Sequence, residues 1–319
     1  MARPFRSCFA HYLSEYVTLR QRLGLKFTRQ SAILYWFDSY LTRTGYAGPL
    51  TQDLVVEFVT HNPAISPGER ASRYSTIDHF SRYYAAYVPD TPLIDPGLFA
   101  TRRQQPVPYI FSEEELGRLL HLAKTLPCHA IRRVTFHAMV ALAATTGLRR
   151  SEVIRLDRAD VDLTTGVLYV RQTKFFKERL VPVHPTTLAV LQDYARVRDA
   201  TYLHPSSPAF FLSMRRTRFS KQTWGLAFRG LVGAMGLSCQ DNPHPTLHSL
   251  RHTFAVRRLE AWYAEGCDVQ ALLPSLATYM GHAHYSDTAY YITATPRLMA
   301  LAAERAETAL LTPVTEVPE

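Results

Sequence analysis

Cysteine is scarce in this chain of 319 residues, which holds only four, and no two of them form a CxxC pair. Cysteines so far apart argue against a disulfide framework and against a cysteine-based zinc site. Sparse, unpaired cysteine is typical of proteins in a reducing compartment, so a cytoplasmic location is the expectation. The four positions are Cys8, Cys128, Cys239 and Cys267.

Long apolar runs are also missing. No stretch of about 18 uncharged apolar residues occurs, so a transmembrane helix and a membrane partner are not expected. The first residues lack the apolar segment of a secretory signal. With 47% apolar and 20% charged residues the composition is that of a globular protein. The length suits about two domains.

Acidic residues are under-represented. The chain carries 27 Asp and Glu against 36 Lys and Arg, for a net charge of +9. A basic balance favours a polyanionic partner, most often a nucleic acid. Arginine provides most of this charge, and its forked donors suit bidentate contacts with phosphate.

Residues 1–87 are predicted to form a compact all-α domain. Apolar residues recur at helical spacing, glycines separate the first segments, and Thr51 suits an N-cap. The expected helices are 9–23, 28–44, 51–60 and 68–87.

Residues 88–108 are predicted to be a linker, because they hold five prolines and an arginine pair. The alternative, a long loop inside one domain, is disfavoured because such loops are uncommon in compact domains.

Residues 109–319 are predicted to form a second domain, mainly helical with a small antiparallel sheet. Ser112 and Glu115 make a capping box. Segments 167–173 and 179–183 alternate as strands of one hairpin. The expected helices are 112–124, 131–146, 151–156, 185–198, 221–235, 247–260, 269–280 and 297–309, followed by a tail.

Four polar segments of this second domain stand out: ATTGLRRSEV, TKFFKERLVPV, HSLRHTFA and MGHAHYSDTAYYI. Each alone has an ordinary structural explanation, such as a solvated helix start, a polar turn or a core tyrosine. His248 and Arg251 are three residues apart, on one face of a helix, so they can point at one ligand.

Together the four segments resemble the tyrosine recombinase (phage integrase) family in order and in spacing, over about residues 107–310. The resemblance implies a helical, SAM-like core-binding domain and a catalytic domain that together form a C-shaped clamp on DNA. It implies a site-specific recombinase, carried in the bacterial cytoplasm and on the nucleoid. This enzyme cleaves and rejoins DNA through a 3′-phosphotyrosyl intermediate, with strand exchange through a Holliday junction. No metal and no other cofactor are expected.

The resemblance also assigns roles. Arg149 and Arg251 would neutralise the developing phosphorane charge, and His248 and His282 would hydrogen-bond the nonbridging oxygens. Lys174 would protonate the departing 5′ oxygen, and Tyr291 would attack phosphorus. Two arginine forks suit such a charge without a metal. Glu152 matches the acidic position that orients the first arginine and histidine.

Neighbouring residues compete for three of these roles, and the family pattern decides between them. Arg149 rather than Arg150 directly follows Gly-Leu. Lys174 rather than Lys177 begins the KxxKxR pattern, and Tyr291 rather than Tyr290 has the family spacing from His282.

The histidines at 244, 248 and 252 are four residues apart, a spacing that can hold zinc on one helix. Two prolines flank His244, however, so the helix is expected to start later. The sequence therefore predicts no metal.

Several further basic residues are candidate DNA contacts, with solvated or structural roles as the alternative. Arginines and tyrosines share the helix 68–87, and others lie in the linker or follow Lys174. The candidates are Arg70, Arg73, Arg82, Arg102, Arg103, Lys177 and Arg179.

The resemblance implies a homotetramer on double-stranded DNA carrying specific recombination sites, with partner recombinases or accessory factors as further candidates. Residues 297–319 would dock on a neighbouring subunit, or else pack on their own domain. The opening segment resembles recombinases of transposable elements, so transposition joins integration and excision among the roles. The competing functions are a catalytically silent DNA-binding relative and a type IB topoisomerase-like enzyme.

Overall fold

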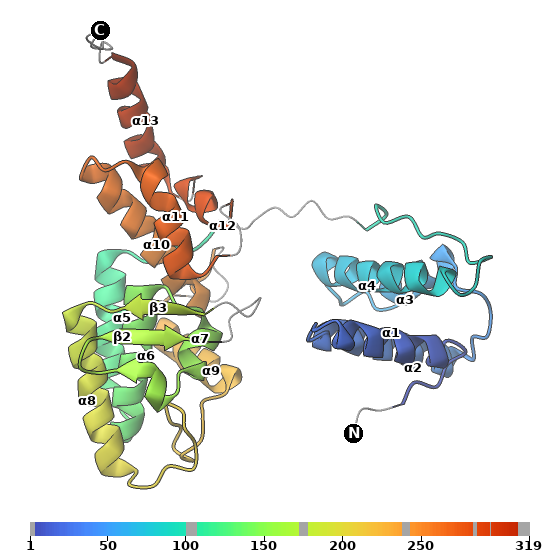
Figure 1. Ribbon diagram of the computed structural model, residues 1–319, viewed down its shortest axis with the longest axis horizontal. Helices are drawn as coiled ribbons and strands as arrows, with labels where there is room; N and C mark the ends of the chain where they lie inside the picture. The colour runs from blue at the N-terminus through green and yellow to red at the C-terminus, as the bar shows by residue number, and fades with distance from the viewer. Residues whose placement is uncertain are drawn as a thin grey trace. The chain divides into compact units, whose positions relative to one another are not determined.

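The computed structural model describes residues 4–99, 107–171, 178–237, 243–282, 286–293 and 295–311. The chain divides into two compact units, Met1–Gln105 and Pro106–Glu319 (Figure 1). Both are built mainly from helices, and the second contains a small antiparallel sheet, which confirms the predicted fold class. Among the described residues no helix is both long enough and apolar enough to span a bilayer.

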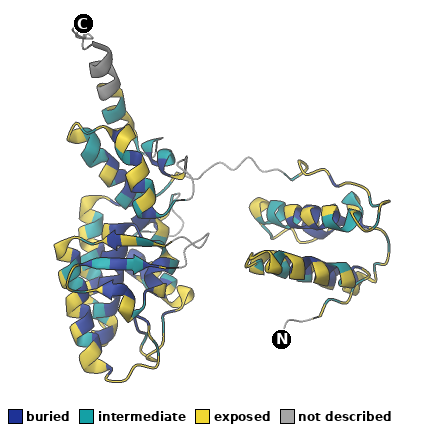
Figure 2. Cartoon of the chain, in the orientation of Figure 1, coloured by how far each residue is buried: buried dark blue, intermediate teal, exposed yellow. Residues whose placement is uncertain are grey.

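The first unit is a four-helix domain. Helix α4 packs against the other three, and aromatic residues from all four helices belong to the core. The buried positions of these helices are dark blue in Figure 2. Thr51 caps α3 as predicted, since its hydroxyl oxygen accepts the backbone N–H of Leu54 at 3.3 Å. The helices are α1 (Ala10–Arg22), α2 (Thr28–Thr44), α3 (Gln52–Thr60) and α4 (Pro67–Ala85).

The first part of the predicted linker belongs to the first unit. Ile94 is 3% exposed and lies in the core of that unit. The hydroxyl of Tyr74 donates to the backbone oxygen of Asp95 at 2.8 Å, and Phe99 packs beside the same tyrosine. The prolines prevent a helix here but leave side chains free to pack, so the first domain extends well past residue 87.

A buried carboxylate secures the start of the chain. Asp38 on α2 is 4% exposed and accepts the backbone N–H groups of Arg6 and Ser7 at 2.8 to 3.0 Å. These bonds satisfy the buried charge, and they hold the segment that precedes α1 against α2.

Helix α6 is central to the second unit, where it packs against α5, α8 and α10. The three-stranded antiparallel sheet has the order β1-β2-β3, and Leu168 faces Val181 in its register. Two of its strands follow the prediction, whereas β1 has two residues, too few to show alternation. The elements are α5 (Glu113–Thr125), α6 (Ala130–Thr146), α7 (Arg150–Arg155), β1 (Val161–Asp162), β2 (Val167–Val170), β3 (Arg179–Pro182), α8 (Pro185–Thr201) and α9 (Lys221–Ala234).

The C-terminal part of this unit has its own apolar cluster, to which α10, α11, the 3₁₀ turn η2 and α13 contribute. Leu298 of α13 is completely buried in it. The first turns of α13 therefore pack on their own unit. For this part of residues 297–319 the structure matches the second of the two expectations, packing on their own domain. The elements are α10 (Leu247–Ala264), α11 (Val269–Met280), α12 (Ser286–Ala289), η2 (Tyr290–Thr293) and α13 (Pro296–Leu311).

We expect Asp38→Asn to destabilise the first unit by about 1–3 kcal/mol, because an amide replaces one carboxylate oxygen by a donor that faces backbone N–H groups. Denaturant unfolding followed by hydrogen exchange checks this, with lost protection at the amides of Arg6 and Ser7. The matched control is Asp90→Asn at an exposed carboxylate. Equal stability of the two variants would contradict the anchoring role.

Candidate active site

The end of α6 begins the candidate site. Gly147 adopts a left-handed conformation with φ of +61°, and a Cβ there would lie 2.6 Å from Cδ1 of Phe254. Only glycine suits this position. After the turn, Arg149 is the N-cap of α7, and its backbone N–H donates to Oε2 of Glu152 at 2.9 Å. The turn therefore places an arginine and a glutamate side by side.

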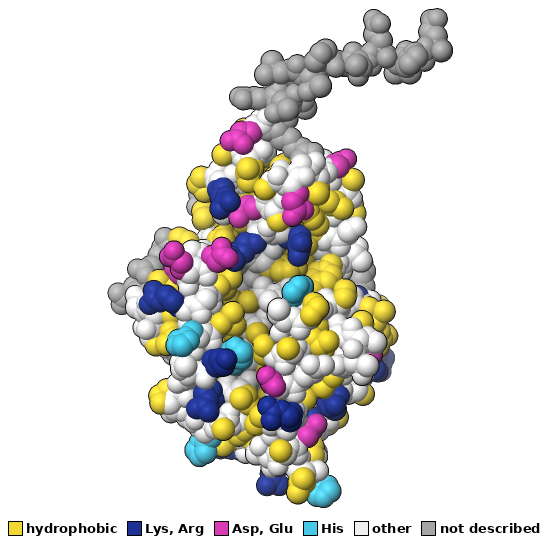
Figure 3. Space-filling view, turned by 90° about the vertical axis from the view of Figure 1, so that its left-hand side faces the viewer, with side chains coloured by type: hydrophobic (Ala, Val, Ile, Leu, Met, Phe, Trp, Pro, Cys, Tyr) yellow, Lys and Arg dark blue, Asp and Glu magenta, His cyan; other side chains and the backbone are white. Residues whose placement is uncertain are grey.

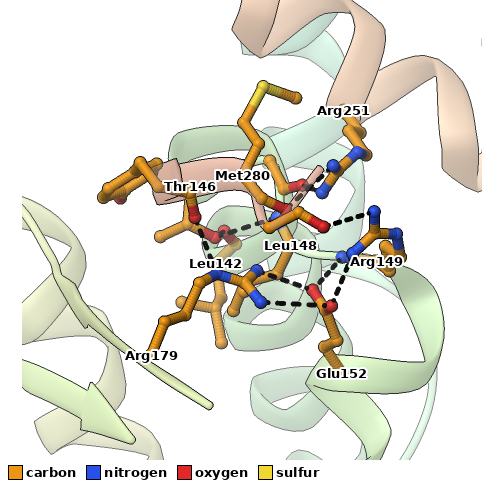
Figure 4. A network of polar contacts seen from close by, with 11 residues as sticks. Leu142, Thr146, Leu148, Arg149, Glu152, Arg179, Arg251 and Met280 are labelled. Atoms are coloured by element: carbon orange, nitrogen blue, oxygen red, sulfur yellow. Dashed lines mark hydrogen bonds and ion pairs between the residues drawn. The ribbon is translucent and has the colours of Figure 1, made fainter. Parts of the chain in front are cut away.

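Glu152 is buried between two guanidinium groups (Figure 4). Its Oε1 accepts Nη1 of Arg149 at 2.9 Å and Nη1 of Arg179 at 3.3 Å. Its Oε2 accepts Nη2 of Arg179 at 3.0 Å. Burial opposes ionisation, but the hydrogen bonds and charges of Arg179 and Arg149 outweigh it and lower the pKa of Glu152. The carboxylate is thus charged at neutral pH.

Arg251 on α10 approaches the same place from the other side and is 2% exposed. Its Nη1 donates to the backbone oxygen of Gly147 at 2.7 Å, and its Nη2 donates to that of Met280 at 2.9 Å. Burial and then the nearby Arg149 lower the pKa of Arg251 to about 10. The guanidinium therefore keeps its charge at neutral pH although it is buried.

Three arginines together cap the C-terminal end of α11. Nε of Arg179 donates to the backbone oxygen of Tyr279 at 2.7 Å, Arg251 binds that of Met280, and Nη2 of Arg149 binds that of Gly281 at 2.8 Å. Carbonyls at a helix end lack partners and carry partial negative charge, so cations stabilise them. We call Arg149, Arg179, Arg251 and Glu152 the arginine bracket.

Three histidines lie beside the bracket. The rings of His248 and His252 meet edge to face with centroids 4.4 Å apart, and Nδ1 of His282 shares a 2.6 Å hydrogen bond with the Thr288 hydroxyl. Burial, followed by the charge of Arg251, lowers the pKa of His248 to about 4 and that of His282 to about 3. His248 is an exposed residue, whereas His252 and His282 are half-buried. All three imidazoles, His252 included, are neutral at pH 7.

Tyr291 stands in η2, and its side chain is 3% exposed. Its ring centroid lies 5.4 Å from that of His252 and 6.1 Å from that of His282. Burial raises the pKa of Tyr291, although the charge of the nearby Arg251 opposes the rise. Tyr290 is only half-buried. Of the two adjacent tyrosines, Tyr291 is the more deeply buried and lies against the site histidines, and its phenol is protonated at neutral pH.

The structure brings together six of the residues that the sequence singled out, from four separate elements. They are Arg149, Glu152, His248, Arg251, His282 and Tyr291. Lys174 and Lys177, as well as Arg102 and Arg103, lie outside the described residues.

Arg179 is placed differently from the expectation. It was predicted as a DNA contact, but its side chain is only 9% exposed and all three of its nitrogens bind protein atoms. The expectation of a phosphate contact is thus replaced by a structural position inside the bracket.

Two arginines of the first unit are also held by protein groups. Arg70 donates to the backbone oxygen of Pro63 at 2.9 Å. Arg73 lies over the ring of Trp36, 4.6 Å from its centroid, and pairs with Glu69 at 3.1 Å. Its side chain is 13% exposed, so it is mainly a packing residue of α4.

Arg82 remains the most open candidate on α4, with a side chain 56% exposed and a pairing to Asp78 at 3.2 Å. The adjacent Tyr83 and Tyr84 are partly buried and pack against the core of the first unit, in which Tyr74 is 1% exposed. Figure 3 looks onto the second unit, where basic and acidic side chains are interspersed among apolar ones in that view.

Two features of the site were not predicted from the sequence. One is the structural role of Arg179, and the other is the position of His252 beside Tyr291, with its Nδ1 buried without a hydrogen-bond partner. The i, i+4 spacing of His248 and His252 on one helix was a usable signal for the second. Across the described part of the chain, no three His, Cys, Asp or Glu side chains gather as a metal-binding group would require.

Residues 110–297 match the model of the "Phage integrase family". A putative integrase/recombinase y4rE of Sinorhizobium fredii is 43% identical over 305 residues, which cover 94% of this chain and 97% of that protein. The tyrosine recombinase XerD of Brucella abortus is 28% identical, over 71% of this chain and 72% of its own length.

Solved structures share the fold. The XerH site-specific recombinase bound to its palindromic difH substrate matches with a TM-score of 0.67 and 16% identity, over 87% of this chain and 79% of that one. The Tn1549 transposon integrase in complex with a circular intermediate DNA matches with a TM-score of 0.65 and 17% identity, over 94% and 99%.

Neutral, partly buried histidines predict a stability that depends on pH. The pKa values of His248, His252 and His282 are lowered in the folded state, to about 4, 4 and 3. Below about pH 6.5 the unfolded chain therefore binds protons that the folded chain does not.

We expect the Tm of the protein to fall as the pH drops from about 7 to about 5, in proportion to this difference in bound protons. Scanning calorimetry over that range checks it, and His252→Asn is expected to show the smaller fall. A Tm that stays constant in both proteins would be incompatible with neutral imidazoles at the site.

Proposed function

The chain belongs to the phage integrase family of tyrosine recombinases, and we propose that it cleaves and rejoins DNA at specific sites through a covalent 3′-phosphotyrosyl intermediate. The observation that carries this proposal is the position of Tyr291. Its buried phenol is close enough to Arg251 for the charge of that arginine to act on it, and its ring centroid lies 5.4 Å from that of His252 and 6.1 Å from that of His282. A nucleophile, a fixed cation and proton acceptors are the groups that metal-free attack on a phosphodiester needs.

Arg149 and Arg251 are suited to hold the scissile phosphate. In each, the terminal nitrogens donate one N–H to a carbonyl or a carboxylate, which fixes the plane of the guanidinium. Each terminal nitrogen has a second N–H. These remaining donors would bind nonbridging oxygens and stabilise the charge that develops as phosphorus becomes pentacoordinate.

Proton transfer follows from the protonation states. The phenol of Tyr291 is protonated at neutral pH, so its proton must leave as the oxygen attacks phosphorus. His248 is neutral and accepts a proton more readily once the negative phosphate lies beside it. His282 would hydrogen-bond a nonbridging oxygen. Lys174 would return a proton to the 5′ oxygen that departs.

The products of this attack are a 3′-phosphotyrosyl bond and a free 5′ hydroxyl. The bond preserves the energy of the original phosphodiester, so that a 5′ hydroxyl of either duplex can reverse the attack without ATP. In recombination the incoming hydroxyl belongs to the partner duplex, and two such exchanges pass through a Holliday junction. We propose a homotetramer on two duplexes, in the service of a mobile element.

The names of similar proteins support this role. They include putative integrases/recombinases of Sinorhizobium fredii and an integrase of the Tn1549 transposon bound to a circular intermediate DNA.

The affinity of the protein for DNA should fall steeply as the salt concentration rises, because phosphate neutralisation releases counterions.

We expect an SDS-stable protein–DNA adduct when the protein meets nicked suicide duplexes drawn from a pool that contains the ends of its own element. Tyr291→Phe should reduce the adduct by about 10³-fold or more, since it removes the nucleophile alone. Tyr290→Phe is the matched control and should form the adduct. Gel electrophoresis after denaturation measures both.

Three results would count against the proposal. An adduct that persists in Tyr291→Phe and disappears in Tyr290→Phe would identify Tyr290 as the nucleophile instead. Tight binding of a duplex with no adduct would identify a silent DNA-binding relative. Relaxation of supercoiled DNA by a monomer, without strand exchange, would identify a topoisomerase-like enzyme.

A further inference from the structure

The fourth member of the bracket, Arg179, has no part in the chemistry proposed above. It begins β3, its side chain is 9% exposed, and its nitrogens bind Glu152 and the backbone oxygen of Tyr279. A surface cation for DNA would keep its donors open, whereas these are used. Its function must therefore be sought inside the protein.

The first contribution of Arg179 is to complete the hydrogen bonding of Glu152. Two bonds reach that carboxylate from Arg149, one from its side chain and one from its backbone N–H. Arg179 supplies two more, one to each oxygen. A carboxylate has about four acceptor positions, and these four bonds occupy them. Held on both oxygens, the carboxylate cannot rotate, and so it fixes the guanidinium of Arg149.

The second contribution concerns charge. Glu152 carries one negative charge, and with Arg149 alone the pair would be neutral. Arg179 adds a second positive charge on the opposite side of the same buried carboxylate. The triad therefore keeps one net positive charge, and this charge lies on the more exposed member, Arg149, whose side chain is 28% exposed. An anionic phosphate is attracted by that surplus.

The third contribution is steric. Gly281 has a φ of +69°, and a Cβ there would lie 2.5 Å from Nη1 of Arg179. The guanidinium thus occupies the space beside the residue that precedes His282. Through Tyr279 and this contact, Arg179 joins β3 to the end of the helix that leads to His282.

We propose that Arg179 is a positioning residue for strand cleavage, which offsets the charge of Glu152 and holds Arg149 and the end of α11 in register. This inference rests on the proposed function, because it concerns the rate of the same reaction. It assigns to Arg179 no contact with DNA.

The test compares Arg179→Gln and Arg179→Lys with Arg218→Gln. Arg218 is a matched control in the same unit: it pairs with Asp157 and donates to the backbone oxygens of Ile154 and Leu156. Single-turnover cleavage of a nicked suicide duplex at saturating protein, the Kd for that duplex, and the Tm are measured for each.

We expect Arg179→Gln to cleave about 10²-fold more slowly, a loss typical of a misplaced catalytic group. Its Kd should rise much less than its rate falls, because the scissile phosphate is one phosphate contact among many on the duplex. Arg179→Lys should lie between the two, since it keeps the charge and loses the fork. Arg218→Gln should lower the Tm without this loss of rate.

The pH profile separates positioning from simple destabilisation. Glu152 is faced by Arg149 from the turn before α7, by Arg179 from β3 and by Arg251 from α10. Removing Arg179 takes away the strongest influence that lowers the pKa of Glu152, so the acid limb of the cleavage rate should move to higher pH. Glu152→Gln in the Arg179→Gln background should recover about tenfold in rate, because it restores the net positive charge that the bracket loses with Arg179.

The outcomes distinguish the two proposals. Absence of an adduct in the wild type overturns the proposed function. An adduct in the wild type, with Arg179→Gln equal to it in rate and pH profile, overturns only the role of Arg179. A rate loss that Arg218→Gln reproduces at the same Tm, with no shift in pH profile and no recovery in the double variant, also overturns it. If Arg179→Gln does not fold, Arg179→Lys tests the positioning alone, since it keeps the charge and loses the fork, and a cleavage rate equal to that of the wild type would overturn the role.

Discussion

The ion pairing of Glu152 is the interaction on which the rest of the site depends. A carboxylate that is 4% exposed is costly to bury unless its charge and its lone pairs are satisfied. Here two guanidinium groups satisfy both. Arg149 precedes α7 and Arg179 begins β3. The pairing that satisfies the buried charge of Glu152 therefore also determines where a loop, a strand and a helix meet.

These two guanidinium groups, together with that of Arg251, also bind backbone carbonyl oxygens. Three consecutive carbonyl oxygens, those of residues 279 to 281, accept one arginine each. This arrangement neutralises the end of α11 and determines the direction in which the chain leaves it toward His282. It also leaves the side chains of Tyr279 and Met280 free to serve the apolar clusters, where both contribute.

Much of this could be predicted from the sequence, because local rules dominate it. Caps at Thr51 and Ser112, glycine at the end of α6, and alternation in β2 and β3 each involve neighbours in the chain. The candidate site was found through four motifs whose residue types suit phosphoryl transfer. The resemblance to a known family, rather than spacing alone, chose among adjacent residues such as Tyr290 and Tyr291.

Arg179 shows why the remainder could not be predicted. At the start of a strand and close to two lysines it has the pattern of a surface residue. Its burial depends on a carboxylate 27 residues earlier and on a carbonyl oxygen 100 residues later. The segment after residue 87 is a similar case, because proline predicts the lack of a helix but not that Ile94 packs into a distant core.

The two units have separate apolar cores. The first is built from residues up to Phe99, and the clusters of the second begin at Tyr109. Amino-acid changes in one core therefore leave the packing of the other untouched. A substitution in the core of the helical unit therefore need not be matched by one in the cores that surround the bracket and Tyr291. Divergence among relatives should accordingly accumulate unevenly along the chain.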